Sequence, residues 1–461
     1  MATEYATWQK QNQMSKICVY PWSHVNINPN GDVWPCCHQR GENIRVYGNF
    51  KKDSIDTIFN SESAKELRRS MLQGVLPPDC AKCIDYEKLG IKSARYWASQ
   101  QGWAQEVLDS IPSITRDDGS VTDYKIKYWD LRWSNLCNMN CVMCDPEWSS
   151  LWTQDVKNKL ANFSDEAIEE DEHLRLFKAS IENDVKKVRH LPNQNWIDDH
   201  ITDVEHIYFA GGEPLIMNEH WYILNKLIEF NRFDVRIKYN TNMLKLDFKG
   251  QNAIDLWKNW DYRKLSVEGS IDETGKRAEW IRSGTVWEIV ENNIKQVRDA
   301  GIQTFANTSI GCYNVVRLPE LIDELYELYN SPINANAQVN LNPVHNYWCS
   351  VQVLPDALKR DILEKTKRWE NKTKSRTNKL ETIYVELEKP HDPLRLRQFW
   401  KRSALIDLNK HSTLFDHIPE FAELNDQTGN MYEKFRDDFI EKSISKRISS
   451  TNSNLCSSIP N

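Results

Sequence analysis

The stretch WDLRWSNLCNMNCVMCDPEW, residues 129–148, is the most informative part of this chain. In it an apolar, strand-like run leads directly into Cys137, Cys141 and Cys144, which are spaced at i, i+4 and i+7. A loop of this size can place three thiolates around one face of an iron–sulfur cube, which normally takes four cysteine ligands. The spacing therefore predicts a cluster in which one iron lacks a protein ligand.

The three cysteines have two other possible interpretations. They could form a three-cysteine zinc site, or they could be three unrelated buried thiols. Zinc motifs usually combine a C-x2-C pair with a second pair or with histidine, and no histidine lies close by in the sequence. The spacing favours the iron–sulfur interpretation.

Strand-like and helical patterns alternate from this stretch onward. The strand-like runs lie at 126–134, 206–212, 235–242, 264–272, 303–311 and 337–344. Helical patterns between them include 220–231, 285–301 and 318–330. Such alternation predicts a parallel sheet covered by helices. We therefore expect an α/β fold, a partial (β/α)6 TIM-like barrel over residues 121–350, with a charged insertion of two helices at 150–204.

Residues 1–120 are expected to form a small cysteine-rich module. Its two candidate thiol pairs are formed by Cys18, Cys36, Cys80 and Cys83. The first pair flanks Asn30-Gly31, which marks a hairpin turn between two alternating runs. The second pair follows a predicted helix over 61–74. On spacing alone, these thiols suit a structural zinc ribbon as well as an iron–sulfur cluster.

The sequence Gly-Gly-Glu-Pro follows the second predicted strand. C-x3-C-x2-C after a first strand, with this motif after the second, resembles the radical S-adenosylmethionine (SAM) superfamily. The resemblance implies that the cysteine triad holds a 4Fe–4S cluster whose open iron binds SAM. It also implies reductive cleavage of SAM to a 5′-deoxyadenosyl radical that modifies a substrate. The SAM amino group would bind the backbone of Gly211, Gly212, Glu213 and Pro214.

Polar residues near two further strand ends correspond to positions that contact the SAM ribose in relatives. The resemblance implies this role for Ser270, after the fourth strand, and for Asn240 or Asn242, after the third. Met143 departs from the family pattern, because relatives often carry an aromatic residue there. Since methionine is apolar and adaptable, we expect altered packing near the adenine rather than lost function.

The N-terminal cysteines resemble the SPASM/twitch extension of radical SAM enzymes, which binds an auxiliary 4Fe–4S cluster. Cys18, Gly31 and Cys36 follow its hairpin pattern as C-x12-G-x4-C. The resemblance implies that Cys36 is a ligand, with Cys37 as a neighbour or alternate, and that the later C-x2-C pair completes the site. The family usually carries this module after the barrel, whereas here it comes first. A zinc ribbon remains the alternative.

Several residues are candidates for the chemical step. Cys312 follows the fifth strand, where barrel active sites lie, and could donate a hydrogen atom or bind substrate. Asp272 could orient SAM or act as a base, and His345 and Cys349 close the sixth strand. A packed or idle thiol is the more common state of such cysteines.

The formal net charge of −7 gives the chain no general basic surface for a polynucleotide, so a nucleic-acid partner is not expected. SPASM/twitch relatives act on ribosomal peptides and proteins, and in some cases on sugars or nucleotides. We expect a peptide or protein substrate, with a nucleotide or sugar as the alternative. Candidate aromatic contacts are Trp148, Trp152, Trp196 and Trp348. A non-catalytic, metal-stabilised binding protein is the competing class.

The remaining expectations concern partners, location and the C-terminal region. A flavodoxin- or ferredoxin-type electron donor is expected. The absence of a signal sequence and of a long apolar run predicts a cytoplasmic protein, and in a reducing cytosol the odd count of 11 cysteines favours metal ligation over disulfides. The polar segment 109–123 is predicted to be a linker, and residues 351–461 a helical extension with a disordered tail from 443.

Overall fold

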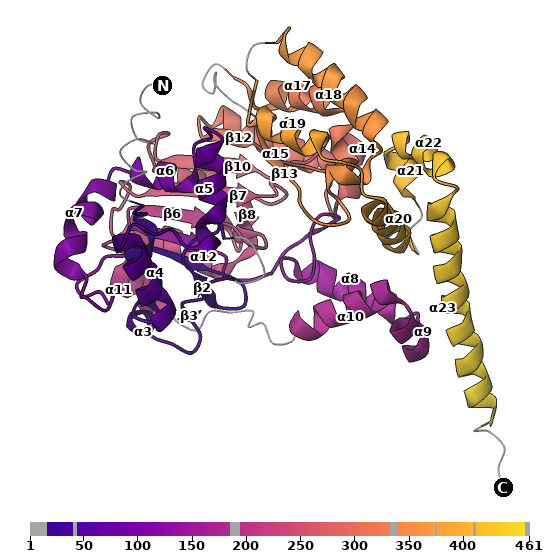
Figure 1. Ribbon diagram of the computed structural model, residues 1–461, viewed down its shortest axis with the longest axis horizontal. Helices are drawn as coiled ribbons and strands as arrows, with labels where there is room; N and C mark the ends of the chain where they lie inside the picture. The colour runs from indigo at the N-terminus through magenta and orange to yellow at the C-terminus, as the bar shows by residue number, and fades with distance from the viewer. Residues whose placement is uncertain are drawn as a thin grey trace. The chain divides into compact units, whose positions relative to one another are not determined.

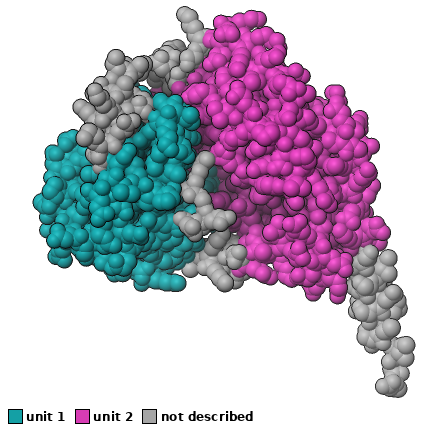
Figure 2. Space-filling view, viewed as in Figure 1, with its two compact units in different colours: residues 1–135, 187–239, 259–266 teal, residues 136–186, 240–258, 267–461 magenta. Residues whose placement is uncertain are grey.

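The computed structural model describes residues 16–39, 44–184, 194–331, 339–373, 376–408 and 412–456. The chain divides into two compact units, which have separate colours in Figure 2. Unit 1 comprises residues 1–135, 187–239 and 259–266, and unit 2 comprises residues 136–186, 240–258 and 267–461. Unit 1 therefore combines the N-terminal module with the first strands of the predicted barrel.

Unit 1 is built on a sheet that the N-terminal module extends. Its strands are, in spatial order, β7 (Arg236–Thr241), β6 (His206–Phe209), β4 (Tyr128–Leu131), β1 (His24–Ile27), β2 (Asp32–Trp34) and β3 (Gly48–Asn49). The pairs β7–β6, β6–β4 and β4–β1 are parallel, whereas β1–β2 and β2–β3 are antiparallel. The hairpin of the module thus adds one parallel strand to the barrel sheet.

The two faces of this sheet differ in chemistry. One face carries Val25, Trp129 and Ile207 side by side, all without exposed surface, and Trp196 packs on Trp129 with ring centroids 4.4 Å apart. On the other face His206 stacks on Tyr128 at 4.3 Å. This alternation follows from the two-residue period of a strand.

Helices surround the sheet of unit 1 (Figure 1). They are α2 (Tyr20–Ser23), α3 (Ile55–Phe59), α4 (Glu62–Leu72), α5 (Ala81–Lys88), α6 (Ala94–Ser99), α7 (Ala104–Ile114), α11 (Gln194–His200) and α12 (Asn218–Glu229), with 3-10 turns at Pro78–Cys80 and Pro214–Ile216. The predicted helix at 61–74 is confirmed as α4. Ser61 caps it by accepting a hydrogen bond from the N–H of Ala64. Gly31 has φ +89°, as the predicted turn requires.

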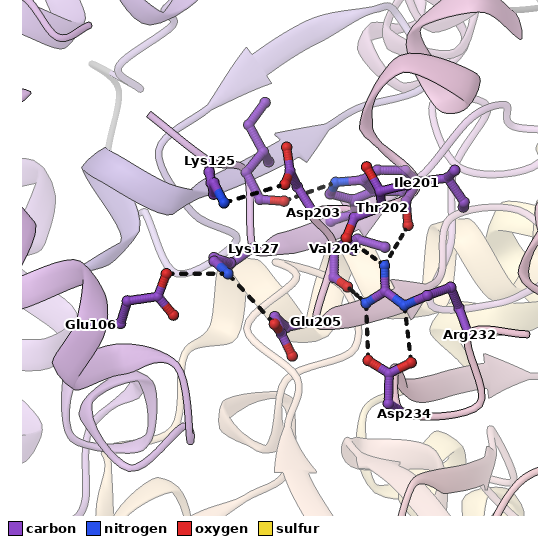
Figure 3. Close-up of polar contacts among 12 residues, drawn as sticks. Glu106, Lys125, Lys127, Ile201, Thr202, Asp203, Val204, Glu205, Arg232 and Asp234 are labelled. Carbon is purple, nitrogen blue, oxygen red and sulfur yellow. Dashed lines mark hydrogen bonds and ion pairs between the residues drawn. The ribbon is translucent and has the colours of Figure 1, made fainter. Parts of the chain in front are cut away.

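A charged network ties together the amino-terminal ends of the strands in unit 1 (Figure 3). The Lys127 ammonium lies 3.5 Å from carboxylates of both Glu106 and Glu205. Arg232 donates to the carbonyls of residues 201, 202 and 204 and pairs with Asp234 at 2.9 Å. In α/β barrels this end contributes to stability, whereas function lies at the carboxyl ends of the strands.

Unit 2 contains the other strands of the predicted barrel. In spatial order they are β10 (Leu265–Gly269, which enters the unit at Val267), β12 (Gln303–Ile310), β13 (Val339–Pro343) and β14 (Thr377–Asn378). The pairs β12–β13 and β13–β14 are parallel. Two short antiparallel pairs accompany them, β5 (Asn140–Cys141) with β11 (Arg282–Ser283) and β8 (Asp247–Phe248) with β9 (Gln251–Asn252).

The helices of unit 2 are drawn in Figure 1, where some pack on its strands and others, including the long C-terminal helix, pack on other helices. They are α8 (Ser150–Leu160), α9 (Asp165–Glu170), α10 (Glu172–Asp184), α13 (Ala253–Trp257), α14 (Gly275–Ile281), α15 (Trp287–Asp299), α16 (Cys312–Val315), α17 (Leu318–Tyr329), α18 (Asp356–Glu370), α19 (Leu380–Glu388), α20 (Pro393–Asp407), α21 (Leu414–His417), α22 (Glu420–Gln427) and α23 (Met431–Cys456), with a 3-10 turn at Val351–Val353.

The α/β prediction is confirmed. All six expected strands form, as β4, β6, β7, β10, β12 and β13, and helices separate them. The expected helices at 220–231, 285–301 and 318–330 correspond to α12, α15 and α17. Six successive βα units are those of a partial (β/α)6 barrel.

Three local expectations were wrong. The first half of the predicted linker belongs to α7, because burial of Val107 and Ile111 outweighs Pro112 inside the helix. In its described residues the insertion 150–204 has four helices rather than two. The C-terminal region adds strand β14 to its helices. Helix α23 spans Met431–Cys456, and the disorder expected from residue 443 stays a prediction.

Among the described residues, no helix combines the length and the apolar character that crossing a bilayer requires.

Candidate active site and auxiliary cluster site

The three cysteines of the predicted triad come together in one loop of unit 2. Cys141 is buried, whereas Cys137 and Cys144 are partly exposed. The N–H of Cys144 donates to the carbonyl of Cys141 at 2.9 Å. A side-chain hydrogen bond with Cys144 lowers the pKa of Cys141, and the same bond, together with burial and the charge of Cys137, raises the pKa of Cys144. The Cys141 and Cys144 thiols are therefore hydrogen-bonded, and Cys137 lies near enough for its charge to act on Cys144.

The protein holds the backbone of this loop tightly. The indole of Trp152 donates to the carbonyl of residue 141 at 2.7 Å, and the indole of Trp348 donates to that of residue 142 at 3.2 Å. The Asn346 amide donates to the carbonyl of residue 143 at 2.8 Å, and Arg402 donates to that of residue 144 at 3.0 Å. Four consecutive carbonyls are thus bonded, which fixes the path of the loop while its thiols stay together.

Arg282 is a functional candidate that the sequence patterns did not indicate. Its Nη1 donates to the sulfur of Cys141 at 3.7 Å, and its Nε donates to Asp272 at 2.7 Å. Asp272 also accepts from the N–H of Ser309 at 2.7 Å. No local sequence signal identifies Arg282, because it reaches the loop only through the pairing of β11 with β5.

The predicted ribose contacts in unit 2 lie at strand ends. Asn242 bonds through its amide to Asn138 in the cysteine loop, at 2.7 Å. The N–H of Ser270 donates to the carbonyl of Thr241 at 2.7 Å, and Asn240 is half-buried in β7. A SAM-contacting role for these residues stays a prediction.

The Gly-Gly-Glu-Pro motif forms a tight turn after β6 in unit 1. Gly211 has φ +102°, and a Cβ there would lie 3.0 Å from the Cα of Arg132. The N–H of Gly212 donates to the carbonyl of Ser134 at 3.1 Å. The buried carboxylate of Glu213 accepts from the N–H of Leu215 at 3.1 Å. Glycine is therefore required at position 211 by both conformation and space.

The candidates for the chemical step are differently placed. Cys312 and Cys349 have no exposed surface, and the N–H of Cys312 donates to the carbonyl of Cys349 at 2.7 Å. Burial raises the pKa of both thiols. His345 is exposed, with its Nδ1 3.6 Å from Glu386. A hydrogen-donating role for Cys312 stays a prediction.

Two of the four candidate tryptophans are buried in the protein. Trp152 is 1% exposed and Trp196 is 4% exposed, so both pack inside their units rather than present an aromatic surface. Trp148 and Trp348 are partly exposed. The guanidinium of Arg402 lies 4.1 Å from the ring centroid of Trp348.

The four predicted auxiliary cysteines line one cavity of about 40 Å³ in unit 1. Cys18 lies at the start of the module, and Cys36 follows β2. Cys80 ends the 3-10 turn at Pro78–Cys80, and Cys83 lies on α5. Apolar side chains such as Leu67 and Met71 complete the wall. Four thiols that line one cavity fit an iron–sulfur cluster.

Backbone hydrogen bonds support these thiols. Burial raises the pKa of Cys18 to about 12, whereas a hydrogen bond from the backbone of Tyr20 lowers it. The backbones of Ala94 and Arg95 bond to Cys83 in the same way. N–H donors to sulfur are among the contacts that tune cluster sites. In the described part of the chain, His, Cys, Asp and Glu side chains form no group of three arranged for a single metal ion.

Cys37 is placed apart from the cavity. It is not among the cavity-lining residues, and its thiol hydrogen-bonds with the side chains of Asp130 and Arg132. Burial and the Asp130 carboxylate raise its pKa to about 11. The geometry thus separates the adjacent cysteines, with Cys36 toward the cavity and Cys37 toward β4.

Family models match both cysteine regions. Residues 131–330 match the model of the Radical SAM superfamily, and residues 18–84 match SPASM, an iron–sulfur cluster-binding domain. The chain therefore contains a radical SAM domain, and a SPASM domain precedes it in the sequence. Its cofactors are accordingly a 4Fe–4S cluster and SAM, together with an auxiliary iron–sulfur cluster of the SPASM domain.

Comparison with solved structures gives distant similarities. One is to Streptococcus suis SuiB bound to precursor peptide SuiA, with 11% identity, a TM-score of 0.35, and 89% of this chain and 88% of that chain covered. Another is to anSMEcpe with bound AdoMet, with 13% identity, a TM-score of 0.33, and coverage of 70% and 98%. No curated protein matches the chain. The family assignment rests on the two family models.

Proposed function

We propose that this enzyme reductively cleaves SAM to a 5′-deoxyadenosyl radical and uses the radical to modify a peptide or protein. The observation that carries the proposal is the meeting of Cys137, Cys141 and Cys144 in one backbone-clamped loop. Three thiolates leave one iron of a 4Fe–4S cluster open for SAM, and the bound cluster supplies the electron for cleavage. A flavodoxin- or ferredoxin-type protein is the proposed donor of that electron.

The chain's own residues hold and orient these groups. Side chains bond the backbone carbonyls of residues 141–144 and so fix the path of the loop. These bonds do not involve the three thiols, which stay available to bind iron. The Gly211 backbone lies too close to Arg132 to carry a side chain, and the tight turn that results is the proposed binding site for the SAM amino group. Asn240 or Asn242 and Ser270 are the proposed ribose contacts.

We assign the auxiliary cluster to Cys18, Cys36, Cys80 and Cys83. The cavity that these cysteines line supports a shared metal centre, and the match to an iron–sulfur cluster-binding domain favours a cluster over a zinc ribbon. Four protein ligands leave no iron open to a substrate. The auxiliary cluster would therefore serve structure or electron transfer.

A peptide or protein substrate is supported by the surface beside the triad. Leu136, directly before Cys137, and Leu151, on α8, are each 39% exposed, and Trp148 between them is partly exposed. Apolar side chains of a peptide can be buried on such residues, whereas phosphates gain little from them. The net charge of −7 disfavours a polyanion.

The test uses full-length protein that is reconstituted anaerobically and reduced with dithionite. Formation of 5′-deoxyadenosine from SAM is measured alone, with a random peptide pool, with nucleotides and with sugars. We expect slow cleavage without substrate and stimulation by the peptide pool. Stimulation by nucleotides or sugars alone would remove the peptide assignment, and absence of any cleavage would remove the function itself.

A further inference from the structure

Arg282 contacts both a triad cysteine and a carboxylate within unit 2. Its strand, β11, places it directly opposite Cys141 in an antiparallel pair. Residues opposite one another in such a pair have neighbouring side chains on the same face. The guanidinium donates through Nη1 to the sulfur of Cys141 at 3.7 Å and through Nε to Asp272 at 2.7 Å. The guanidinium of Arg282 therefore bridges the Cys141 sulfur and the Asp272 carboxylate.

Asp272 is itself fixed, so the position of the cation is fixed too. Its second oxygen accepts from the N–H of Ser309 at 2.7 Å, and its carbonyl accepts from the amide of Asn314 at 2.7 Å. The carboxylate is 2% exposed, and the Arg282 side chain is 15% exposed. Solvent therefore screens this pair weakly.

The placement of these charges has a predictable effect on reduction. Hydrogen bonds to cluster sulfurs and nearby charges are among the factors that set cluster potentials. One electron from the donor adds negative charge to a centre that three thiolates already make negative. A cation beside a sulfur favours that addition, and an anion behind the cation opposes it. Arg282 and Asp272 should thus act in opposite directions.

We propose that Arg282 and Asp272 are positioning residues that together set the reduction potential of the cluster held by the triad. Arg282 raises the potential, and Asp272 moderates that effect while it holds the guanidinium against Cys141. The proposal rests on the proposed function, in that the triad must hold the cluster. It gives Asp272 a role other than binding SAM or acting as a base.

The experiment is a redox titration of full-length, reconstituted protein without SAM, followed by electron paramagnetic resonance. The variants are Arg282→Gln, Arg282→Lys and Asp272→Asn. Arg317→Gln is the matched control, because Arg317 also pairs with a buried carboxylate, that of Glu273 at 2.7 Å. The auxiliary cluster in the same samples is an internal reference, and iron per chain is measured for each variant.

We expect Arg282→Gln to shift the one-electron equilibrium about tenfold toward the oxidised cluster, which is about 59 mV more negative. Asp272→Asn should shift the potential in the opposite direction, Arg282→Lys should retain most of the wild-type value, and Arg317→Gln should not change it. A structural role would not give shifts of opposite sign.

Shifts in the same direction for Arg282→Gln and Asp272→Asn, or no shift while the triad cluster is present, would overturn the proposal. If Arg282→Gln loses the cluster, Asp272→Asn decides: a more positive potential supports the proposal, and an unchanged or more negative potential overturns it. A wild-type protein without any triad cluster would instead contradict the proposed function, and this inference with it.

Discussion

The side-chain amide of Asn242 donates a hydrogen bond to Oδ1 of Asn138, with the two atoms 2.7 Å apart. Its own oxygen accepts from the N–H of Leu244 at 3.0 Å, so both ends of the amide are bonded. Asn138 directly follows Cys137. A residue that the family resemblance associates with the SAM ribose therefore also ties the end of β7 to the cysteine loop.

Replacing Asn242 should loosen that loop. We expect Asn242→Ala to lose about 2 kcal/mol of stability and to release iron from the triad site faster than wild type, because two part-buried hydrogen bonds disappear. Iron content after dialysis against a chelator measures this. Asn425→Ala is the control, since Asn425 also bonds through both ends of its amide, to Glu433 and Tyr432. Equal iron loss in both variants would contradict the prediction.

Adjacent cysteines should differ in their effect on the auxiliary cluster. Cys36 lines the cavity, whereas the Cys37 thiol bonds with Asp130 and Arg132. We expect wild-type protein to carry about eight irons per chain, as two four-iron cubes. Cys36→Ala should lose about half of them, and Cys37→Ala should keep them. The opposite result would make Cys37 the ligand, and stoichiometric zinc with only one cube would favour the ribbon.

Gly211 should tolerate no side chain. We expect Gly211→Ala to cost about 1–3 kcal/mol, because φ is +102° and the new Cβ would lie 3.0 Å from the backbone of Arg132. SAM affinity, measured by calorimetry, should fall. Gly74→Ala is the matched control, since Gly74 has φ +76° and a Cβ there would have no neighbour within 4 Å. Unchanged SAM affinity in the Gly211 variant would remove this turn from the SAM site.

His206 should make unit 1 sensitive to acid. Burial lowers its pKa to about 3 from 6.5, and neither ring nitrogen has a hydrogen-bond partner. Between pH 6.5 and pH 3, His206 is protonated in the unfolded chain but neutral in the folded protein. The free energy of unfolding therefore decreases as the pH falls through this range. At pH 5 this amounts to about 2 kcal/mol.

His206→Phe should remove that dependence and keep the stack on Tyr128. We expect the variant to be at least as stable as wild type at pH 7 and more stable at pH 5, as measured by denaturant unfolding. His220→Phe is the control: burial lowers its pKa similarly, but its ring bonds to the hydroxyl of Tyr239 at 2.8 Å. That control should lose stability at pH 7. Parallel losses in both variants would contradict the account.

Local patterns were enough to predict the elements of the fold. The six strands and helices α12, α15 and α17 follow from runs of apolar residues with the period of each structure. The hairpin follows from Asn30-Gly31, and α4 follows from its Ser61 cap. The cysteine spacings predicted which thiols come together, and both groups do so in the structure.

Contacts between distant segments could not be predicted in this way. The parallel pairing of β1 with β4 joins the N-terminal module to the barrel sheet, and no turn or spacing in the sequence indicates it. The contact of Arg282 with Cys141 spans 141 positions and depends on the register of two short strands. The different directions of Cys36 and Cys37 likewise depend on tertiary structure rather than on spacing.

The most direct test of the central claim is SAM cleavage by a protein in which Cys137, Cys141 and Cys144 are all replaced by Ala. The matched comparison is Cys80→Ala with Cys83→Ala, and the background control is Cys456→Ala. With dithionite and SAM, the triad variant should form no 5′-deoxyadenosine but should retain the absorbance of the auxiliary cluster. A triad variant that still produces 5′-deoxyadenosine would contradict the assignment of these three cysteines to the catalytic cluster.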